Sequence, residues 1–188
     1  MKRKIQDMDV KNKKVLLRCD FNVPIKNNKI LDDSKIMASL NTINYLINNG
    51  AKIIILSHFG KVKKEEDKAN NSLQIVAAHL QKLIKTKIFF SPQTRNINLA
   101  LKINSLNPGE ILFLENTRFE DVPDKLESTN DAQLSEYWAS LADIYCFDAF
   151  GSAHRKHAST YGVANYLPNC IGFLVQHEIE MLDQHILN

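Results

Sequence analysis

Short apolar runs alternate along this chain with segments of helical periodicity, and this alternation most constrains the fold. The apolar runs cover residues 15–19, 52–57, 87–90, 111–114 and 144–147. Each run is short enough and apolar enough to form a strand that is buried on both faces. Strands separated by helices pair in parallel, and the helices cover both faces of the sheet. The sequence therefore predicts the α/β class, with a mostly parallel sheet between layers of helices.

Four helices are predicted between these strands, and a fifth is predicted at the end of the chain. The first carries an apolar stripe over residues 36–47 and stops at Asn49-Gly50, a typical C-terminal signal. Ser72 can cap a second helix that extends to residue 83, a third covers residues 99–103, and a fourth covers residues 134–141. Residues 174–188 predict a final helix with no strand after it, and residues 61–71 predict a polar loop.

Composition bounds the size of the domain and the kind of partner. The 188 residues are 44% hydrophobic, which is enough to bury the core of one domain with at most an appended piece. The formal net charge is only +3, which argues against a general nucleic-acid binder. Any affinity for phosphate must therefore come from the local arrangement of charges.

Cysteine usage and the N-terminal residues indicate a cytoplasmic protein. Cys19, Cys146 and Cys170 are odd in number, and two of them lie inside apolar runs, where a thiol behaves as a small buried hydrophobe. This usage favours a reducing compartment. Met1-Lys2-Arg3-Lys4 is basic, but no apolar signal region follows it, and no apolar run approaches the ~20 residues that span a bilayer. We therefore expect neither export nor a membrane role.

The turn after the fifth apolar run, residues 148–157, is rich in cationic groups. His154, Arg155, Lys156 and His157 occupy four consecutive positions. A strand that ends in a turn of small residues leaves backbone N–H groups free, and guanidinium and imidazole groups add donors suited to phosphate or carboxylate. The turn therefore predicts an anion-binding site, and the alternative is a solvated basic loop.

Polar side chains follow three of the other apolar runs, at the point where each strand ends. Asp20 and Asn22 follow the first run, His58 follows the second, and Arg118 follows the fourth. Parallel sheets place their ligand sites at the carboxyl ends of the strands, so these residues should meet the basic turn at one edge of the sheet. Arginines with histidines suit a phosphate, whereas Asp20 and Asn22 suit hydroxyl groups. The expected ligand is a small phosphorylated hydroxy acid.

Each of these residues also has a purely structural interpretation. Asn22 could cap its turn, His58 could be a hydrogen-bonded histidine at a strand end, and Arg118 could pair with Glu115 or Glu120. Their coincidence at one edge favours a site over separate structural roles. Motifs for other chemistries are missing from the sequence, namely Gly-x-Gly-x-x-Gly, Gly-x4-Gly-Lys-[Ser/Thr], a spaced Cys/His set for zinc, and a nucleophile elbow.

The sequence resembles the amino-terminal half of phosphoglycerate kinase over essentially its whole length. The motifs that carry the resemblance are, in order, Arg18-Cys19-Asp20-Phe21-Asn22-Val23-Pro24, Asp32-Asp33-Ser34-Lys35-Ile36, Gly50-Ala51-Lys52, Leu56-Ser57-His58-Phe59-Gly60, Leu114-Glu115-Asn116-Thr117-Arg118-Phe119, Asp148-Ala149-Phe150-Gly151-Ser152-Ala153-His154-Arg155 and Gly172-Phe173-Leu174. They occur in the family's order and spacing. The resemblance implies a three-layer Rossmann-like domain that binds 3-phosphoglycerate or 1,3-bisphosphoglycerate through a basic patch.

The resemblance also implies a role for each matching residue. Asp20 and Asn22 would hold the hydroxyl and carboxyl end of the substrate, and its phosphate would be held by His58, Arg118 and Arg155, with His154 and His157 alongside. Lys35 stands where the family has the arginine that stabilises the transferring phosphoryl group, and Lys61 stands in place of the arginine of a Gly-Arg-Pro turn. Both lysines keep the charge but lose the planar fork that binds two phosphate oxygens at once.

The family's chain continues beyond the matching region, and this sets the expected domain organisation. By resemblance, residues 1–173 are the N-terminal substrate-binding domain, residues 174–188 begin the interdomain helix, and the C-terminal nucleotide-binding domain is absent. No metal or cofactor is expected in this chain, because the magnesium complex of ATP or ADP belongs to the C-terminal domain. The resemblance implies a glycolytic phosphotransferase with a carboxyl group as acceptor, and this chain alone is not expected to turn over.

Two other functions remain open at this point. One is a truncated, non-catalytic module that binds a small phosphorylated acid or a partner protein, which Lys35 and Lys61 favour slightly. The other is an unrelated nucleotide-binding α/β domain, which the missing glycine motif disfavours. A further departure from the family is Phe147, which replaces an asparagine usually found before the Asp-Ala-Phe-Gly turn.

The final helix carries an apolar stripe that could cause self-association. Ile179, Leu182 and Ile186 fall on one face at helical spacing, and Met181 and Leu187 flank it. Without a partner, this stripe either folds back onto the sheet or faces water, where it would favour dimerisation.

Overall fold

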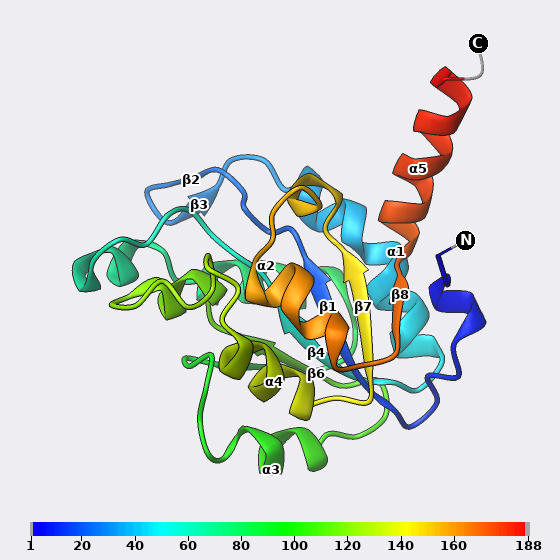
Figure 1. Ribbon diagram of the computed structural model, residues 1–188, viewed down its shortest axis with the longest axis horizontal. Coiled ribbons are helices and arrows are strands. Elements are labelled where there is room, and N and C mark those ends of the chain that lie inside the picture. The colour runs from blue at the N-terminus through cyan, green and yellow to red at the C-terminus, as the bar shows by residue number, and fades with distance from the viewer. Residues whose placement is uncertain (1, 187–188) are drawn as a thin grey trace.

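The computed structural model describes residues 2–186, and six strands of this region form one parallel sheet (Figure 1). The strand order is β5-β6-β4-β1-β7-β8. The strands are β1 (Lys14–Cys19), β4 (Lys52–Leu56), β5 (Ile88–Ser91), β6 (Ile111–Leu114), β7 (Ile144–Asp148) and β8 (Asn169–Ile171). Leu17 at the centre of β1 pairs in register with Ile55 of β4 and Cys146 of β7. The carboxyl ends of four neighbouring strands, β6, β4, β1 and β7, therefore lie side by side.

Helices cover both faces of this sheet, which confirms the predicted three-layer α/β architecture. The helices are α1 (Ser34–Asn48), α2 (Gln74–Leu83), α3 (Leu99–Asn104), α4 (Ala132–Ser140) and α5 (Phe173–Ile186). One buried cluster joins Leu17 and Ile55 to α1 and α2, and a second joins Leu16 and Ile54 to α3 and to Trp138 of α4. Successive strand residues point to opposite faces, so one apolar strand supplies both clusters.

All five predicted strands are present, but the expectation that β5 is buried on both faces is wrong. β5 lies at an edge of the sheet, and the Phe89 side chain is 37% exposed. The ammonium of Lys87 lies 4.4 Å from the centre of the Phe89 ring and shields it in part. An apolar run of four residues looks the same at an edge as at the centre of a sheet, because periodicity does not report the position of a strand.

Several short elements within residues 2–186 were not predicted. β8 has only three residues, and a hairpin of β2 (Ile25–Lys26) and β3 (Lys29–Ile30) turns through Asn27 and Asn28. These two asparagines adopt φ values of 51° and 57°, a left-handed conformation that asparagine tolerates and that two-residue hairpin turns require. The polar loop 61–71 also contains a 3₁₀ helix, Glu65–Asn70.

Two predicted helix ends agree with the structure. Gly50 follows the end of α1 with a φ of 71°, which glycine adopts without steric cost. The hydroxyl of Ser72 accepts a hydrogen bond of 3.2 Å from the N–H of Gln74, the first residue of α2. Ser72 therefore satisfies one of the free N–H groups at the start of that helix, although Leu73 is the residue in the cap position.

Helix α5 packs against α1 at its beginning and extends away from the rest of the molecule at its end (Figure 1). Ile179 is partly buried, whereas Met181 is 41% and Leu182 is 49% exposed. The side chain of Ile186 and all of Leu187 lie outside the described residues. Self-association through this stripe stays a prediction. No helix within residues 2–186 is long and apolar enough to cross a membrane.

Candidate anion-binding site

The polar residues predicted from the strand ends lie on turns at one edge of the sheet. Asp20 and Asn22 follow β1, His58 follows β4, and Arg118 lies in a 3₁₀ helix, Thr117–Asp121, after β6. Arg155 follows β7 and a short 3₁₀ helix, Phe150–Ser152. Because β6, β4, β1 and β7 are consecutive neighbours, the sheet brings these turns together as predicted.

The buried side chain of Asn116 holds two of these turns and the entry to α2 in fixed positions. Its Oδ1 accepts hydrogen bonds of 3.0 Å from the N–H groups of Phe59 and Arg118. Its Nδ2 donates to the carbonyl of Phe59 at 2.7 Å and to that of Asn71 at 2.9 Å. One carboxamide therefore uses its donors and acceptors to join three segments that are distant in sequence.

The turns after β1 and β4 are also joined directly. The hydroxyl of Ser57 accepts a hydrogen bond of 2.9 Å from the N–H of Phe21. Asn22 Oδ1 accepts one of 3.0 Å from the N–H of Gly60, so Asn22 links two turns rather than capping its own. Gly60 has a φ of 59°, and a Cβ atom there would lie 2.2 Å from Asn71 Oδ1, so the turn has no space for a side chain.

His58 is a buried neutral imidazole whose free N–H can serve as a hydrogen-bond donor. It is 5% exposed, and its Nδ1 lies 3.1 Å from Arg18 Nη2. A guanidinium only donates, so Nδ1 accepts and the ring proton is assigned to Nε2. Burial, followed in order by the charges of Arg18, Arg155, Lys35 and Arg118, lowers the pKa of His58 to about 2.

The remaining predicted residues, His154, His157 and Lys61, differ in how deeply they enter the site. His157 is half-buried, and burial followed by the charges of Arg118 and Arg155 lowers its pKa to about 4. The charges of Arg155 and Arg118 thus lower the pKa of both His58 and His157. His154 and Lys61 are exposed, and within residues 2–186 their side chains form no hydrogen bond or ion pair. The structure therefore gathers the core of the predicted set but leaves these two at its margin.

Asp20 and Lys35 form an ion pair. Lys35 Nζ lies 3.1 Å from Asp20 Oδ2, and the Lys35 side chain is 48% exposed whereas that of Asp20 is 11% exposed. Because Lys35 is so exposed, the pair itself adds little stability, and the ammonium can turn to another anion. The other carboxylate oxygen of Asp20 accepts a hydrogen bond of 3.1 Å from the N–H of Asn22, which fixes the turn.

Arg118 pairs with a residue that the sequence interpretation did not consider. Its Nε lies 2.6 Å from Oδ2 of Asp121, whose side chain is only 3% exposed. The expected alternatives are wrong, because Glu115 accepts a hydrogen bond of 2.7 Å from the N–H of Leu73 and Glu120 lies 2.6 Å from Arg95 Nη2. On the 3₁₀ helix, the spacing of three residues places Arg118 and Asp121 on the same side.

Arg18 is a buried cation that sequence analysis did not assign to the site. Its side chain lies within β1 and is 1% exposed. Nε donates to the hydroxyl of Ser159 at 2.9 Å, Nη1 donates to the carbonyl of Cys19, and Nη2 contacts His58. Arg18 therefore determines which nitrogen of His58 carries the proton. A charged residue inside an apolar run was the one signal that could have revealed this role.

Glu127 provides the negative charge that faces Arg18 across Ser159. It is fully buried, and it accepts hydrogen bonds from the N–H of Ser159 at 2.9 Å and from the Ser159 hydroxyl. Burial raises the pKa of Glu127, whereas the charge of Arg18 and the hydrogen bonds from Ser159 lower it. A continuous polar chain thus runs from Glu127 through Ser159 and Arg18 to His58. No sequence pattern marked Glu127, which lies in a turn, or Ser159, which lies in the π-helix Ala158–Gly162.

Asp148 at the end of β7 connects the basic turn to α5. It is fully buried, and its Oδ1 accepts a hydrogen bond of 3.2 Å from the N–H of Val175 in the first turn of α5. Within residues 2–186, its Oδ2 has no hydrogen-bond partner. Burial raises the pKa of Asp148 to about 6, and hydrogen bonds from Thr42, Val175 and Leu174 oppose this rise.

We expect Asp148→Asn to change the pH dependence of stability. The folded pKa of about 6 exceeds the ordinary value of 3.8, so the contribution of Asp148 is most favourable below pH 3.8 and is lost as the pH rises to 6. The two-unit shift corresponds to about 3 kcal/mol. The free energy of unfolding of Asp148→Asn relative to the wild type should therefore rise by up to this amount between pH 4 and 6. Parallel curves in urea titrations across this range would contradict the prediction.

The fold and the site together define an α/β domain with a rigid, cationic sheet edge suited to a small anion. A family model for phosphoglycerate kinase matches residues 5–188. The chain is 52% identical over 182 residues to phosphoglycerate kinase of Macrococcus caseolyticus and 49% identical over 191 residues to that of Fusobacterium nucleatum. The solved structure of phosphoglycerate kinase from Coxiella burnetii superposes with a TM-score of 0.84 at 34% identity. The chain belongs to the phosphoglycerate kinase family.

The chain spans about half the length of the curated relatives that it matches. The two sequence alignments cover 97% and 100% of this chain but only 46% and 48% of the relatives. The superposition on the solved structure covers 98% of this chain and 45% of the other chain. Within residues 2–186, no three His, Cys, Asp or Glu side chains are grouped so as to hold a metal ion. The acidic residues nearest the site are already paired, Asp20 with Lys35 and Asp121 with Arg118.

Proposed function

We propose that this chain is the acceptor-substrate half of a phosphoglycerate kinase. It binds 3-phosphoglycerate or 1,3-bisphosphoglycerate, and a phosphoryl group moves between this substrate and ADP or ATP as a cytoplasmic step of glycolysis. The observation that carries the proposal is that the turns bearing Asn22, His58, Arg118 and Arg155 follow the carboxyl ends of four neighbouring strands at one edge of the sheet. The family match supports the identity of the substrate.

Different residues at this edge of the sheet bind different groups of the substrate. Arg118 and Arg155 bind its phosphate through charge-assisted hydrogen bonds, and the Nε2–H of His58 adds a neutral donor. Asn22 and Asp20 face its hydroxyl and carboxyl end. A bound anion offers Lys35 a second partner, so its ammonium turns from Asp20 to the transferring phosphoryl group, and Asp20 becomes free to accept a hydrogen bond from the substrate hydroxyl.

Catalysis in this proposal consists of positioning and electrostatic stabilisation. The phosphoryl group leaves the acyl phosphate of 1,3-bisphosphoglycerate with its charge spread over three oxygens, and cations at fixed positions stabilise that charge. Lys35 presents a single ammonium in place of a planar fork, so it stabilises the phosphoryl group as a point charge. The nucleotide is supplied by a C-terminal domain in cis.

Binding of 3-phosphoglycerate to the 188-residue chain tests this proposal. Titration calorimetry should detect weak binding that weakens further as salt is added. Arg155→Ala should reduce the affinity by roughly 1.5–3 kcal/mol, because a charge-assisted hydrogen bond to the phosphate is lost. The matched control is Lys156→Ala, since the ammonium of Lys156 lies 4.8 Å from the Tyr161 ring and is engaged there.

Two results would count against the proposal. One is an affinity for 3-phosphoglycerate that is equal in the wild type and in Arg155→Ala. The other is ATP-dependent turnover by the purified chain in a coupled assay, because in this proposal the nucleotide is bound by a C-terminal domain.

A further inference from the structure

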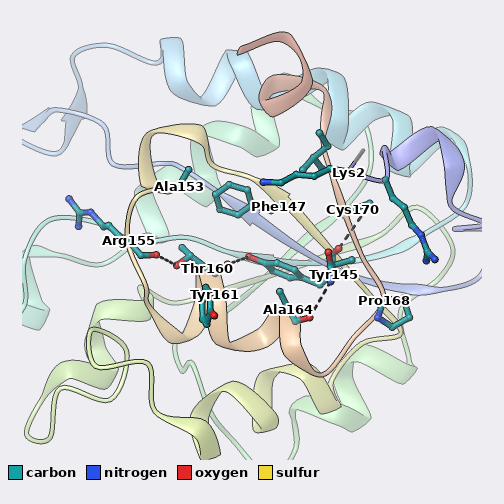
Figure 2. A pocket seen from close by; sticks show the side chains of 13 residues that line it. Lys2, Tyr145, Phe147, Ala153, Arg155, Thr160, Tyr161, Ala164, Pro168 and Cys170 are labelled. Carbon is teal, nitrogen blue, oxygen red and sulfur yellow. Dashed lines mark hydrogen bonds between the residues drawn. The ribbon is translucent and has the colours of Figure 1, made fainter. Parts of the chain in front are cut away.

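A cavity of about 620 Å³ opens beside the edge strand β8 (Figure 2). Its floor is formed by β7 and β8, one wall by the N-terminal residues Lys2 and Arg3, and the other wall by the segment from Thr160 to Ala164. The volume lies within the range of ~300–1,000 Å³ that is typical of small-molecule sites. Tyr145 and Phe147 point to this side of the sheet, opposite to Cys146 and Asp148. The cavity therefore lies on a different face from the start of α5.

The charged residues that line this cavity are all cationic. They are Lys2, Arg3 and Arg155, and no aspartate or glutamate is among the lining residues. Within residues 2–186, none of these three side chains forms an ion pair or a hydrogen bond. Lys4, the next basic residue along the chain, is in contrast paired with Glu180 at 3.6 Å. Unpaired cations around one concave surface raise the local concentration of anions there.

The floor of the cavity offers an aromatic surface as well as charge. The Phe147 ring is half-buried, and Figure 2 shows the amino group of Lys2 directed toward it. Ala153, Ala164 and Pro168 add small apolar surfaces around the ring. A flat apolar group can stack on Phe147 while its negative charge meets the lysine above it.

We propose that this cavity binds an aromatic anion, with its ring on Phe147 and its phosphate, sulfonate or carboxylate at the ammonium group of Lys2. Figure 2 shows the Arg155 side chain directed away from Phe147 and Lys2, so its guanidinium remains available to the candidate substrate site. Binding in the cavity therefore does not depend on the proposed function.

Titration with 1-naphthyl phosphate, followed by amide chemical shifts and calorimetry, tests the proposal. The shifts should concentrate at Phe147 and in the segment from Thr160 to Ala164. Lys2→Gln should weaken binding about 5-fold, as expected for the loss of one exposed charge contact. Phe147→Leu, which keeps an apolar side chain of similar size in the core, should weaken it roughly 10-fold because stacking is lost. Lys29→Gln, in the exposed hairpin, is the matched control for charge.

Two control ligands separate the contribution of the aromatic ring to the affinity from that of the charge. Inorganic phosphate and 1-naphthol should each bind more weakly than 1-naphthyl phosphate. Equal weakening by Lys2→Gln and Lys29→Gln would overturn the proposal, and so would shifts confined to His58 and Asn22. A chain that bound 1-naphthyl phosphate in the cavity but did not bind 3-phosphoglycerate would support the proposal and would contradict the proposed function.

Discussion

Glu127→Ala is expected to lower the free energy of unfolding by about 3–5 kcal/mol, because it leaves the buried guanidinium of Arg18 without a counter-charge. The carboxylate of Glu127 is fully buried and binds both the N–H and the hydroxyl of Ser159, which in turn accepts from Arg18. Glu127→Gln should cost less, since its amide oxygen can still accept from Ser159. Urea denaturation at pH 7 measures both differences.

Glu127→Ala should also change the tautomer preference of His58. If Arg18 shifts, Nδ1 of His58 loses its donor, and the preference for the Nε2–H tautomer should weaken in nitrogen-15 spectra of the ring. Glu66→Ala, an exposed glutamate, is the control and should change stability by less than about 0.5 kcal/mol. If Glu127→Ala does not fold, Ser159→Ala gives the same test with a smaller change. A stable variant with an unchanged His58 spectrum would refute the role given to this network.

Arg118→Ala is expected to weaken 3-phosphoglycerate binding by roughly 1.5–3 kcal/mol, equivalent to about 10- to 150-fold in the dissociation constant. It should also lower the free energy of unfolding, because Asp121 would keep a buried charge without its partner. The pair is only partly enclosed, so the loss of stability should lie between the values for surface and for buried pairs, at roughly 1–3 kcal/mol.

Arg95→Ala separates these two effects. In the wild type, the guanidinium of Arg95 lies 2.6 Å from Glu120, a contact as short as that between Arg118 and Asp121 on the same 3₁₀ helix. Arg95 itself belongs to the loop after the edge strand β5. It should therefore change stability without changing the affinity for 3-phosphoglycerate. Calorimetry that found the same loss of affinity in both variants would show that the role of Arg118 is structural.

The sequence was sufficient to predict the sheet and the position of the site. Buried parallel strands are continuous apolar runs, and the topology of such a sheet brings the residues that follow each run to one edge. The placement of Arg118, Arg155 and His58 at this edge was therefore predictable without coordinates, whereas their role in binding stays a prediction. The edge position of β5 and the short strand β8 were not, because both depend on pairing across the sheet rather than on the local pattern.

The partners of the charged residues were the least predictable part. Arg118 was expected to pair with Glu115 or Glu120, but both are used elsewhere, by Leu73 and Arg95 respectively. Arg18 and Glu127 are linked through Ser159, which lies in the π-helix Ala158–Gly162. Such contacts depend on the path of loops in space, which the spacing of residues along a sequence does not specify.

The carboxamide of Asn116 has a consequence for how an anion would bind. Its four hydrogen bonds keep the turn after β4, the turn after β6 and the entry to α2 in a single arrangement before any ligand arrives. The conformational entropy of these loops is therefore lost when the chain folds rather than when it binds. When a ligand binds at this edge, only a few exposed side chains such as Lys35 become ordered, so the entropy cost of binding is small. Even a small anion that makes few contacts can therefore bind with measurable affinity.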